Sequence, residues 1–206
     1  WNDNETNQDF YEWIGLIKSI IISGPPAIGK TTIAKGLAKE FNLVHLSGGD
    51  ILKELAEEEG FDTRGDDWWD TQEGMNFLSR RQKNSEFDKK VDDKLKKLFS
   101  KGDVVITSYT LPWLVDGGVK IWLAGSKENS AQRMTARDNL SKNDALEIVQ
   151  KRYNENKIIY KTLYGFEFGD DLSVFDKIIE TDELNVEQVL EVAKSIVRNI
   201  FDAKTT

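Results

Sequence analysis

Short apolar runs alternate with longer amphipathic segments from residue 19 to the C-terminal region. The apolar runs are typical of buried strands, which we predict at residues 19–22, 43–46, 104–106, 119–123 and 177–179. The amphipathic segments carry apolar residues at helical spacing, which predicts helices at 29–41, 50–59, 87–99, 127–140, 144–164 and 186–200. Strands that alternate with helices indicate a parallel sheet with right-handed crossovers. We therefore expect an α/β fold in three layers, with a five-stranded sheet covered by helices on both faces.

Residues 1–17 do not follow this alternation. The segment begins polar and Asn-rich and then carries Phe10, Tyr11 and Trp13. We expect a loose N-terminal extension at 1–17 and a single domain at 18–206, a length that suits one hydrophobic core. Two roles for the aromatic part are open: a turn docked on the domain, or a contact between two copies of the chain.

Composition excludes several kinds of site. The chain has no cysteine and one histidine, which excludes disulfides, thiolate zinc sites and cysteine nucleophiles and argues against a Ser-His-Asp triad. The 28 basic and 36 acidic residues give a net charge of −8, which argues against general nucleic-acid binding. Each apolar run is shorter than the roughly 20 residues that span a bilayer. We expect a cytoplasmic protein without nucleic-acid or membrane partners.

Residues 24–31 read Gly-Pro-Pro-Ala-Ile-Gly-Lys-Thr and match the phosphate-binding pattern G-x-x-x-x-G-K-[ST]. The pattern lies between a predicted strand and a predicted helix, where unpaired helix N–H groups attract phosphate. We expect Lys30 to reach the outer phosphates and the Thr31 hydroxyl to help hold Mg²⁺. The predicted ATP-binding residues are Gly24, Pro25, Pro26, Ala27, Ile28, Gly29, Lys30, Thr31 and Thr32. The loop by itself does not separate a kinase from a GTPase or a motor.

Two further groups of residues suit anionic ligands. Asp50, after two glycines, can cap a helix and accept a bond from a ligand hydroxyl, and Lys53 follows in the first turn. Later in the chain, Arg133 and Arg137 share a helix face and precede Arg152. Arginine forks match phosphate oxygens. Each group has an ordinary alternative: a capped helix with a solvated lysine, or a helix face with surface ion pairs.

With these motifs, the sequence resembles the nucleoside monophosphate kinases, and more narrowly the archaeal-type cytidylate kinases. The matching segments are 22–26, 29–32, 47–51, 120–123, 160–165, 171–173 and 175–176. The resemblance implies a P-loop fold with small helical insertions, a monophosphate-binding region at about 47–100 and a lid at about 130–160. It implies transfer of the ATP γ-phosphoryl group to CMP or dCMP with Mg²⁺, by a monomer or weak homodimer.

The resemblance also implies roles for single residues. Lys30, Arg133, Arg137 and Arg152 would act in catalysis, and Ser47, Gly49, Asp50 and Lys53 would face the monophosphate.

The sequence departs from the family pattern at several positions. Ala27 stands where glycine is frequent, which costs on the order of 1 kcal/mol if the position needs positive φ. Lys53 replaces an arginine. After the third strand, Thr107-Ser108-Tyr109 replaces an acidic residue, a glycine and an arginine. We therefore expect Tyr109 to stack on the acceptor base and Arg81 to supply the missing phosphate contact. Trp68 and Trp69 would either enclose the base or fill a small core.

Alternatives to this function remain open at this point. The acceptor could be AMP, UMP, shikimate, a sugar or a nucleic-acid 5′ end. A nucleotide-binding regulatory module without turnover is a further interpretation, although an Asn-Lys-x-Asp guanine signature is not found in the sequence.

Overall fold

The computed structural model describes residues 18–64, 68, 71–81, 86–138 and 140–205. The expected N-terminal extension at 1–17 and Trp69 lie outside the described residues.

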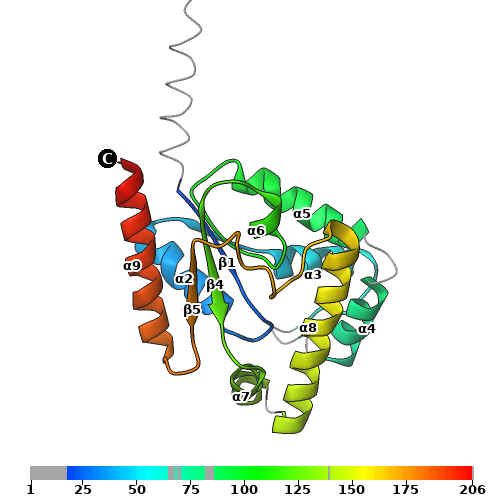
Figure 1. Cartoon of the computed structure of the whole chain (residues 1–206). Coiled ribbons are helices and arrows are strands. Elements are labelled where there is room, and N and C mark those ends of the chain that lie inside the picture. The colour runs from blue at the N-terminus through cyan, green and yellow to red at the C-terminus, as the bar shows by residue number, and fades with distance from the viewer. Residues whose placement is uncertain (1–17, 65–67, 69–70, 82–85, 139, 206) are drawn as a thin grey trace, which may run out of the picture.

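Five parallel strands form the central layer (Figure 1). They are β1 (Ser19–Ser23), β2 (Val44–Ser47), β3 (Val104–Thr107), β4 (Val119–Ala124) and β5 (Lys177–Glu180). Their order in the sheet is β2-β3-β1-β4-β5, and each neighbouring pair is parallel. The predicted five-stranded parallel sheet is confirmed. Because the strands are parallel, their carboxyl ends meet at one edge of the sheet, where ligands bind in folds of this kind.

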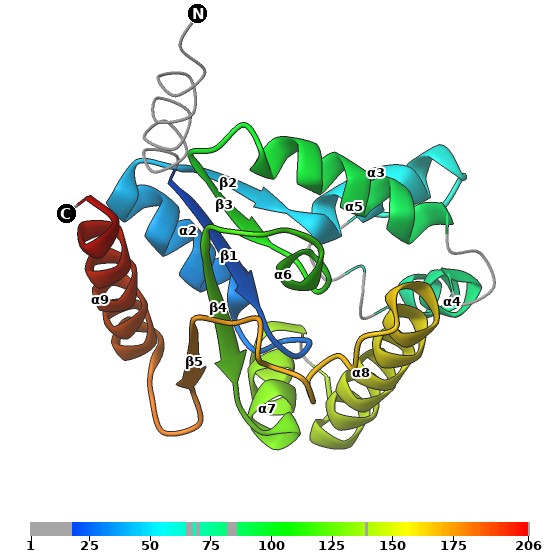
Figure 2. The same ribbon diagram turned by 45° about the horizontal axis from the view of Figure 1, so that its top comes forward.

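Helices cover both faces of the sheet, as the alternation of strands and helices predicted. Helices α2 (Lys30–Phe41) and α9 (Val186–Thr205) cover one face, and α3 (Gly48–Glu58), α5 (Glu86–Phe99) and α6 (Leu111–Leu114) cover the other (Figure 2). Strand β1 divides its side chains between the two cores with the period of two that a strand requires. Ile20 and Ile22 face the α2–α9 core, and Ile21 faces the α3–α5 core.

Three more helices lie beyond the carboxyl edge of the sheet: α4 (Gln72–Arg81), α7 (Lys127–Asp138) and α8 (Lys142–Tyr164). Helices α7 and α8 pack on each other, and α4 packs on α8. An aromatic cluster attaches α8 to the sheet: the ring centroid of Phe168 lies 5.7 Å from Tyr160 and 5.4 Å from Trp122 of β4. The segment expected as a lid is therefore a helix pair anchored to the core at its C-terminal end.

None of the helices in the described part of the chain is long and apolar enough to cross a membrane.

Candidate active site

A cavity of about 690 Å³ opens where β1, β2 and β3 end. The residues that line it come from the loop after β1 and the start of α2, from the end of β2 and α3, from the end of β3 and the segment after it, and from helices α4, α5, α7, α8 and α9. The cavity therefore joins the predicted phosphate-binding loop to the region expected to bind a second substrate.

The loop after β1 has the backbone conformation of a phosphate cradle. Gly24 has φ 148°, and a Cβ atom there would lie 2.5 Å from the main-chain oxygen of Leu123. Ala27 has φ 58° and Gly29 has φ 100°, so the alanine occupies the left-handed conformation that the sequence analysis considered. Ala27 to Thr32 line the cavity. Gly24, Pro25 and Pro26 are not among the described lining residues, although all three were predicted to bind ATP.

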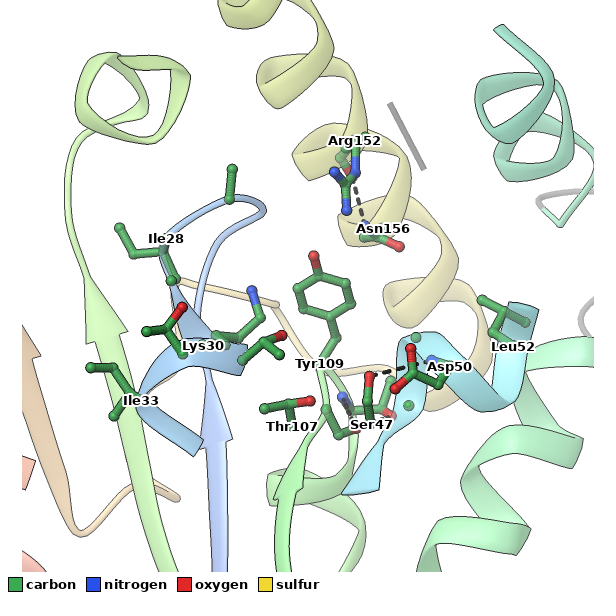
Figure 3. A pocket seen from close by; sticks show the side chains of 18 of the residues that line it. Ile28, Lys30, Ile33, Ser47, Asp50, Leu52, Thr107, Tyr109, Arg152 and Asn156 are labelled. Atoms are coloured by element: carbon green, nitrogen blue, oxygen red, sulfur yellow. Dashed lines mark hydrogen bonds between the residues drawn. The ribbon is translucent and has the colours of Figure 1, made fainter. Parts of the chain in front are cut away.

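Lys30 is held at the mouth of this loop. Its Nζ donates hydrogen bonds to the main-chain oxygens of Gly24 at 2.9 Å and Pro25 at 2.5 Å. The same atom lies 4.6 Å from the ring centroid of Tyr109. Burial, followed by the positive charge of Arg152, holds the pKa of Lys30 well below its usual value. An anion bound between the two cations would relieve this repulsion. Figure 3 shows Lys30, Tyr109 and Arg152 around the same space.

The expected lid arginines have different positions. Arg133 of α7 donates from Nη1 to the main-chain oxygen of Ile28 at 2.6 Å and from Nη2 to that of Thr181 at 3.3 Å. It therefore ties the phosphate-binding loop to the segment after β5, while it also lines the cavity. Arg152 of α8 lines the cavity as well. The side chain of Arg137 lies outside the described part of the structure.

The start of α3 differs from the expectation in two respects. Ser47, and not Asp50, caps the helix: its hydroxyl oxygen accepts the main-chain N–H of Asp50 at 3.3 Å. Asp50 lies in the first turn, and Ser47, Gly49 and Asp50 all line the cavity, as expected for a ligand-facing segment. Among the described lining residues Leu52 is present and Lys53 is not. The structure therefore does not bring Lys53 to the cavity.

The segment that departs from the family pattern forms the turn into α6. The Ser108 hydroxyl oxygen accepts the main-chain N–H groups of Thr110 at 3.2 Å and Leu111 at 3.1 Å. Thr107 and Tyr109 line the cavity on either side of Ser108. Tyr109 therefore lies at the cavity beside Lys30.

Arg81 and Asp88 form an ion pair on the wall opposite the loop. Nε of Arg81 donates to Oδ2 of Asp88 at 3.2 Å, and Nη2 donates to Oδ1. Each residue is only 4% exposed, yet both line the cavity. Arg81 therefore lies at the cavity, but a carboxylate already neutralises its charge.

Trp68 does not enclose this space. It is 1% exposed and packs 5.6 Å from the ring of Phe77 in the α3–α5 core. Of the two roles considered for the tryptophans, the core role is the correct one for Trp68.

Asp92, one turn after Asp88, joins three parts of the site. It accepts hydrogen bonds from the hydroxyl groups of Thr110 and, at 2.6 Å, Tyr164 at the end of α8. Burial raises the pKa of Asp92 to about 6, although these two hydrogen bonds act in the opposite direction.

Sequence reasoning missed both carboxylates, although α5 contains a signal for them. Asp88, Asp92 and Leu95 are spaced as one helix face, and all three are buried. Acidic residues in an apolar stripe indicate a polar function for that face, because unpaired buried carboxylates are costly.

Comparison with known proteins identifies a kinase family that matches most of the chain. The model of the cytidylate kinase-like family matches residues 19–183. The cytidylate kinase of Methanocaldococcus jannaschii is 32% identical over 186 residues, 88% of this chain and 98% of that protein. The cytidylate kinase of Sulfurisphaera tokodaii is 32% identical over 179 residues, 85% of this chain and 93% of that protein.

A solved structure extends the similarity to the fold. Shikimate kinase from Acinetobacter baumannii in complex with shikimate matches with a TM-score of 0.54 at 19% identity, over 95% of this chain and 99% of that chain. At this identity the match shows the fold alone. The family match and the two curated relatives confirm the resemblance that the motifs indicated: the chain belongs to the cytidylate kinase-like family.

Proposed function

We propose that this protein transfers the γ-phosphoryl group of ATP to CMP or dCMP and so forms CDP or dCDP. The observation that carries the proposal is the cavity that joins the phosphate-binding loop to the α3–α5 wall. Two anionic substrates fit such an arrangement, one at each end, with their phosphates facing each other between Lys30 and Arg152. The family and the names of the relatives support the same activity.

The donor half binds the ATP phosphates. The main-chain N–H groups at the start of α2 can donate hydrogen bonds to the phosphate oxygens, and the partial positive charge of the helix end favours binding of the anion. Lys30 exchanges its bonds with the Gly24 and Pro25 oxygens for bonds with phosphate oxygens. A charged phosphate is a stronger acceptor than a neutral carbonyl, which favours that exchange.

The residues at the cavity fit Mg²⁺ held together with substrate phosphates. Thr31 supplies a hydroxyl oxygen and Asp50 a carboxylate at the cavity, both hard oxygen donors of the kind Mg²⁺ accepts. When bound, the ion supplies neutralisation of charge on the transferred group.

The chemical step requires positioning more than proton transfer. The acceptor phosphate is already anionic near neutral pH, so a strong general base is unnecessary. Arg152 and Lys30 line the same cavity, which supports a role for both in neutralising charge on the transferred group. Movement of α8 toward the loop would exclude water and so limit hydrolysis of ATP.

A substrate panel tests the proposal. Purified protein is incubated with ATP, Mg²⁺ and one of CMP, dCMP, AMP, UMP, GMP or shikimate, and the phosphorylated product is quantified. We expect CDP and dCDP as the main products. A chain that binds ATP but phosphorylates none of these acceptors would contradict the proposal and favour a regulatory module.

The protein acts as a monomer or weak homodimer in this proposal. Light scattering during gel filtration at several protein concentrations measures the oligomeric state. A tight dimer at all concentrations would contradict it.

A further inference from the structure

Tyr109 connects the lysine of the phosphate-binding loop to the aromatic cluster that anchors α8. Nζ of Lys30 lies over the Tyr109 ring, 4.6 Å from its centroid. The same ring meets Phe168 at an interplanar angle of 84° with centroids 5.4 Å apart, and it lies 6.3 Å from the Tyr160 ring of α8. Figure 3 shows the Tyr109 ring between Lys30 and the helix that carries Arg152. Tyr109 therefore links the phosphate-binding loop to α8.

A neutral aromatic ring suits the place beside this lysine. The face of an aromatic ring attracts a cation, and the attraction strengthens where water is excluded. A carboxylate would also hold the ammonium group, but its charge would repel the ATP phosphates. An arginine, the residue of the family pattern, would add a further positive charge beside Lys30, whose pKa is already lowered by burial and by Arg152. Of these three groups, the ring alone attracts Lys30 without a net charge.

The ring is fixed well enough to position a neighbour. Tyr109 follows Ser108, whose hydroxyl oxygen accepts two main-chain N–H groups of the turn into α6. Phe168, on which the ring packs, is fully buried and also lies 5.4 Å from the ring of Trp122 in β4. A ring held both through its main chain and through this contact has little freedom to move away from Lys30.

The contact also fits the exchange of partners that ATP binding requires. In the structure, Lys30 donates to the main-chain oxygens of Gly24 and Pro25. Hydrogen bonds depend on direction, so these two bonds weaken when the ammonium group turns toward phosphate oxygens. Attraction to the face of a ring depends mainly on the distance to the ring, so Tyr109 stays a partner of Lys30 during the exchange.

We propose that Tyr109 is a positioning residue for Lys30: its ring keeps the ammonium group at the phosphate-binding loop while the bonds of that group pass from the loop to the ATP phosphates. The inference rests on the proposed function, because it assigns a role in the same phosphoryl transfer. It differs from the expected stacking of Tyr109 on the acceptor base. Stacking on the base would act on the KM for CMP, whereas positioning of Lys30 acts on ATP binding and on kcat.

The test compares Tyr109→Leu, which removes the ring, with Tyr109→Phe, which keeps it. We expect Tyr109→Leu to lower kcat for CDP formation about tenfold, which corresponds to about 1.4 kcal/mol, and to leave the KM for CMP within about twofold. Calorimetry without acceptor should show affinity for a non-hydrolysable ATP analogue with Mg²⁺ that is about fivefold weaker, in the range of a cation–π contact. Tyr109→Phe should stay within about threefold of the wild type in kcat and affinity, because the ring face remains.

Phe166→Leu is the matched control. It removes an aromatic ring from the same cluster, where Phe166 stacks on Trp113 with centroids 4.4 Å apart. Phe166 is not among the described residues that line the cavity. The control should therefore keep the wild-type affinity for the ATP analogue and the wild-type kcat.

A double-mutant cycle shows whether Tyr109 acts through Lys30. In the Lys30→Met background, Tyr109→Leu should change the affinity for the ATP analogue less than about twofold, because the ammonium group that the ring positions is gone. Thermal melting shows which variants are folded. Tyr109→Met, with an unbranched side chain, replaces Tyr109→Leu if the leucine variant does not fold.

Four results would each overturn the inference: equal losses in Tyr109→Phe and Tyr109→Leu, equal losses in Phe166→Leu, an effect confined to the KM for CMP, or an undiminished effect of Tyr109→Leu in the Lys30→Met background. A wild type that forms no CDP overturns the proposed function instead. The affinities for the ATP analogue then still test the contact between Tyr109 and Lys30.

Discussion

Nη1 of Arg133 lies 2.6 Å from the main-chain oxygen of Ile28, although the two residues are 105 positions apart. This bond, with those to Thr181, makes α7 a direct support of the phosphate-binding loop. An arginine expected to touch the transferred phosphoryl group therefore supports the phosphate-binding loop through its main chain.

Replacement of Arg133 by alanine should weaken ATP binding selectively. Hydrogen bonds made by charged groups contribute roughly 1.5–3 kcal/mol, and partial exposure of Arg133 places the expected loss near the lower limit. We expect KM for ATP to rise about tenfold and KM for CMP to change less than twofold, in steady-state assays with each substrate varied. Gln132→Ala, an exposed neighbour on α7, is the control. Equal increases in both KM values would contradict the role of Arg133 in supporting the phosphate-binding loop.

Replacement of Lys30 by methionine should remove most turnover and leave the fold intact. Methionine keeps the length of the side chain but cannot donate to the outer phosphates. We expect less than a tenth of the wild-type kcat for CDP formation, a loss of at least about 1.4 kcal/mol in transition-state stabilisation. Thermal melting would show whether the loss of the bonds to Gly24 and Pro25 changes stability. Lys39→Met, exposed on the same helix, should have wild-type activity. A Lys30 variant with more than a tenth of the wild-type rate would refute the role.

The sequence predicted those parts of the fold that depend on local pattern. The strands are short apolar runs, buried at β1, β3 and β4 and more exposed at the edge strands β2 and β5. The predicted ends agree with the observed ones within a few residues, as at β4 and α2. Helix α4 was missed, because Gly74 and polar residues interrupt its apolar spacing. Packing on α8 supplies the stability that its own sequence lacks. Helix α6, at four residues, is too short for a periodic signal.

The part of the site that depends on a local motif could also be predicted from the sequence. The phosphate-binding loop is contiguous in sequence, so its residues and the left-handed conformation of Ala27 could be predicted from the motif. The contact of Tyr164 with Asp92 joins positions 72 apart, which residue spacing does not encode. The expected position of Lys53 depended on the rotation of one helix, and the structure places Leu52 at the cavity instead.

Replacement of Ala27 by glycine should relieve strain in the loop. Ala27 has φ 58°, a conformation that costs an L-residue roughly 1–2 kcal/mol and costs glycine little. Glycine also loses more chain entropy on folding, so we expect a net change in the free energy of unfolding between about zero and +1 kcal/mol. Urea unfolding measures it. Ala34→Gly, buried within α2, should instead lose about 1 kcal/mol or more. Destabilisation of the Ala27 variant to the same extent would show that the loop is not strained there.

Asp92 should make the stability of the protein depend on pH in a defined window. Burial raises its pKa to about 6 in the folded chain, against about 3.9 in an unfolded one. Between these values the folded state binds more protons than the unfolded state, so the free energy of unfolding falls as pH rises from about 4 to about 6. Of the charged groups nearby, the negative charge of Asp88 raises the pKa of Asp92 further, and the positive charge of Lys96 lowers it.

Asp92→Asn removes this titration. Its amide also changes the bonds with Thr110 and Tyr164, but that change is the same at every pH and does not alter the slope. The wild-type free energy of unfolding minus that of the variant should therefore fall by roughly 2 kcal/mol between pH 4 and pH 6 and stay constant above about pH 7. Urea unfolding at half-unit pH steps measures the difference. Asp93→Asn, with its exposed carboxylate, should show much less change over the same window. A flat difference for Asp92→Asn would mean that Asp92 ionises in the folded chain as it does in water, and that the junction of α5, α6 and α8 is open to solvent.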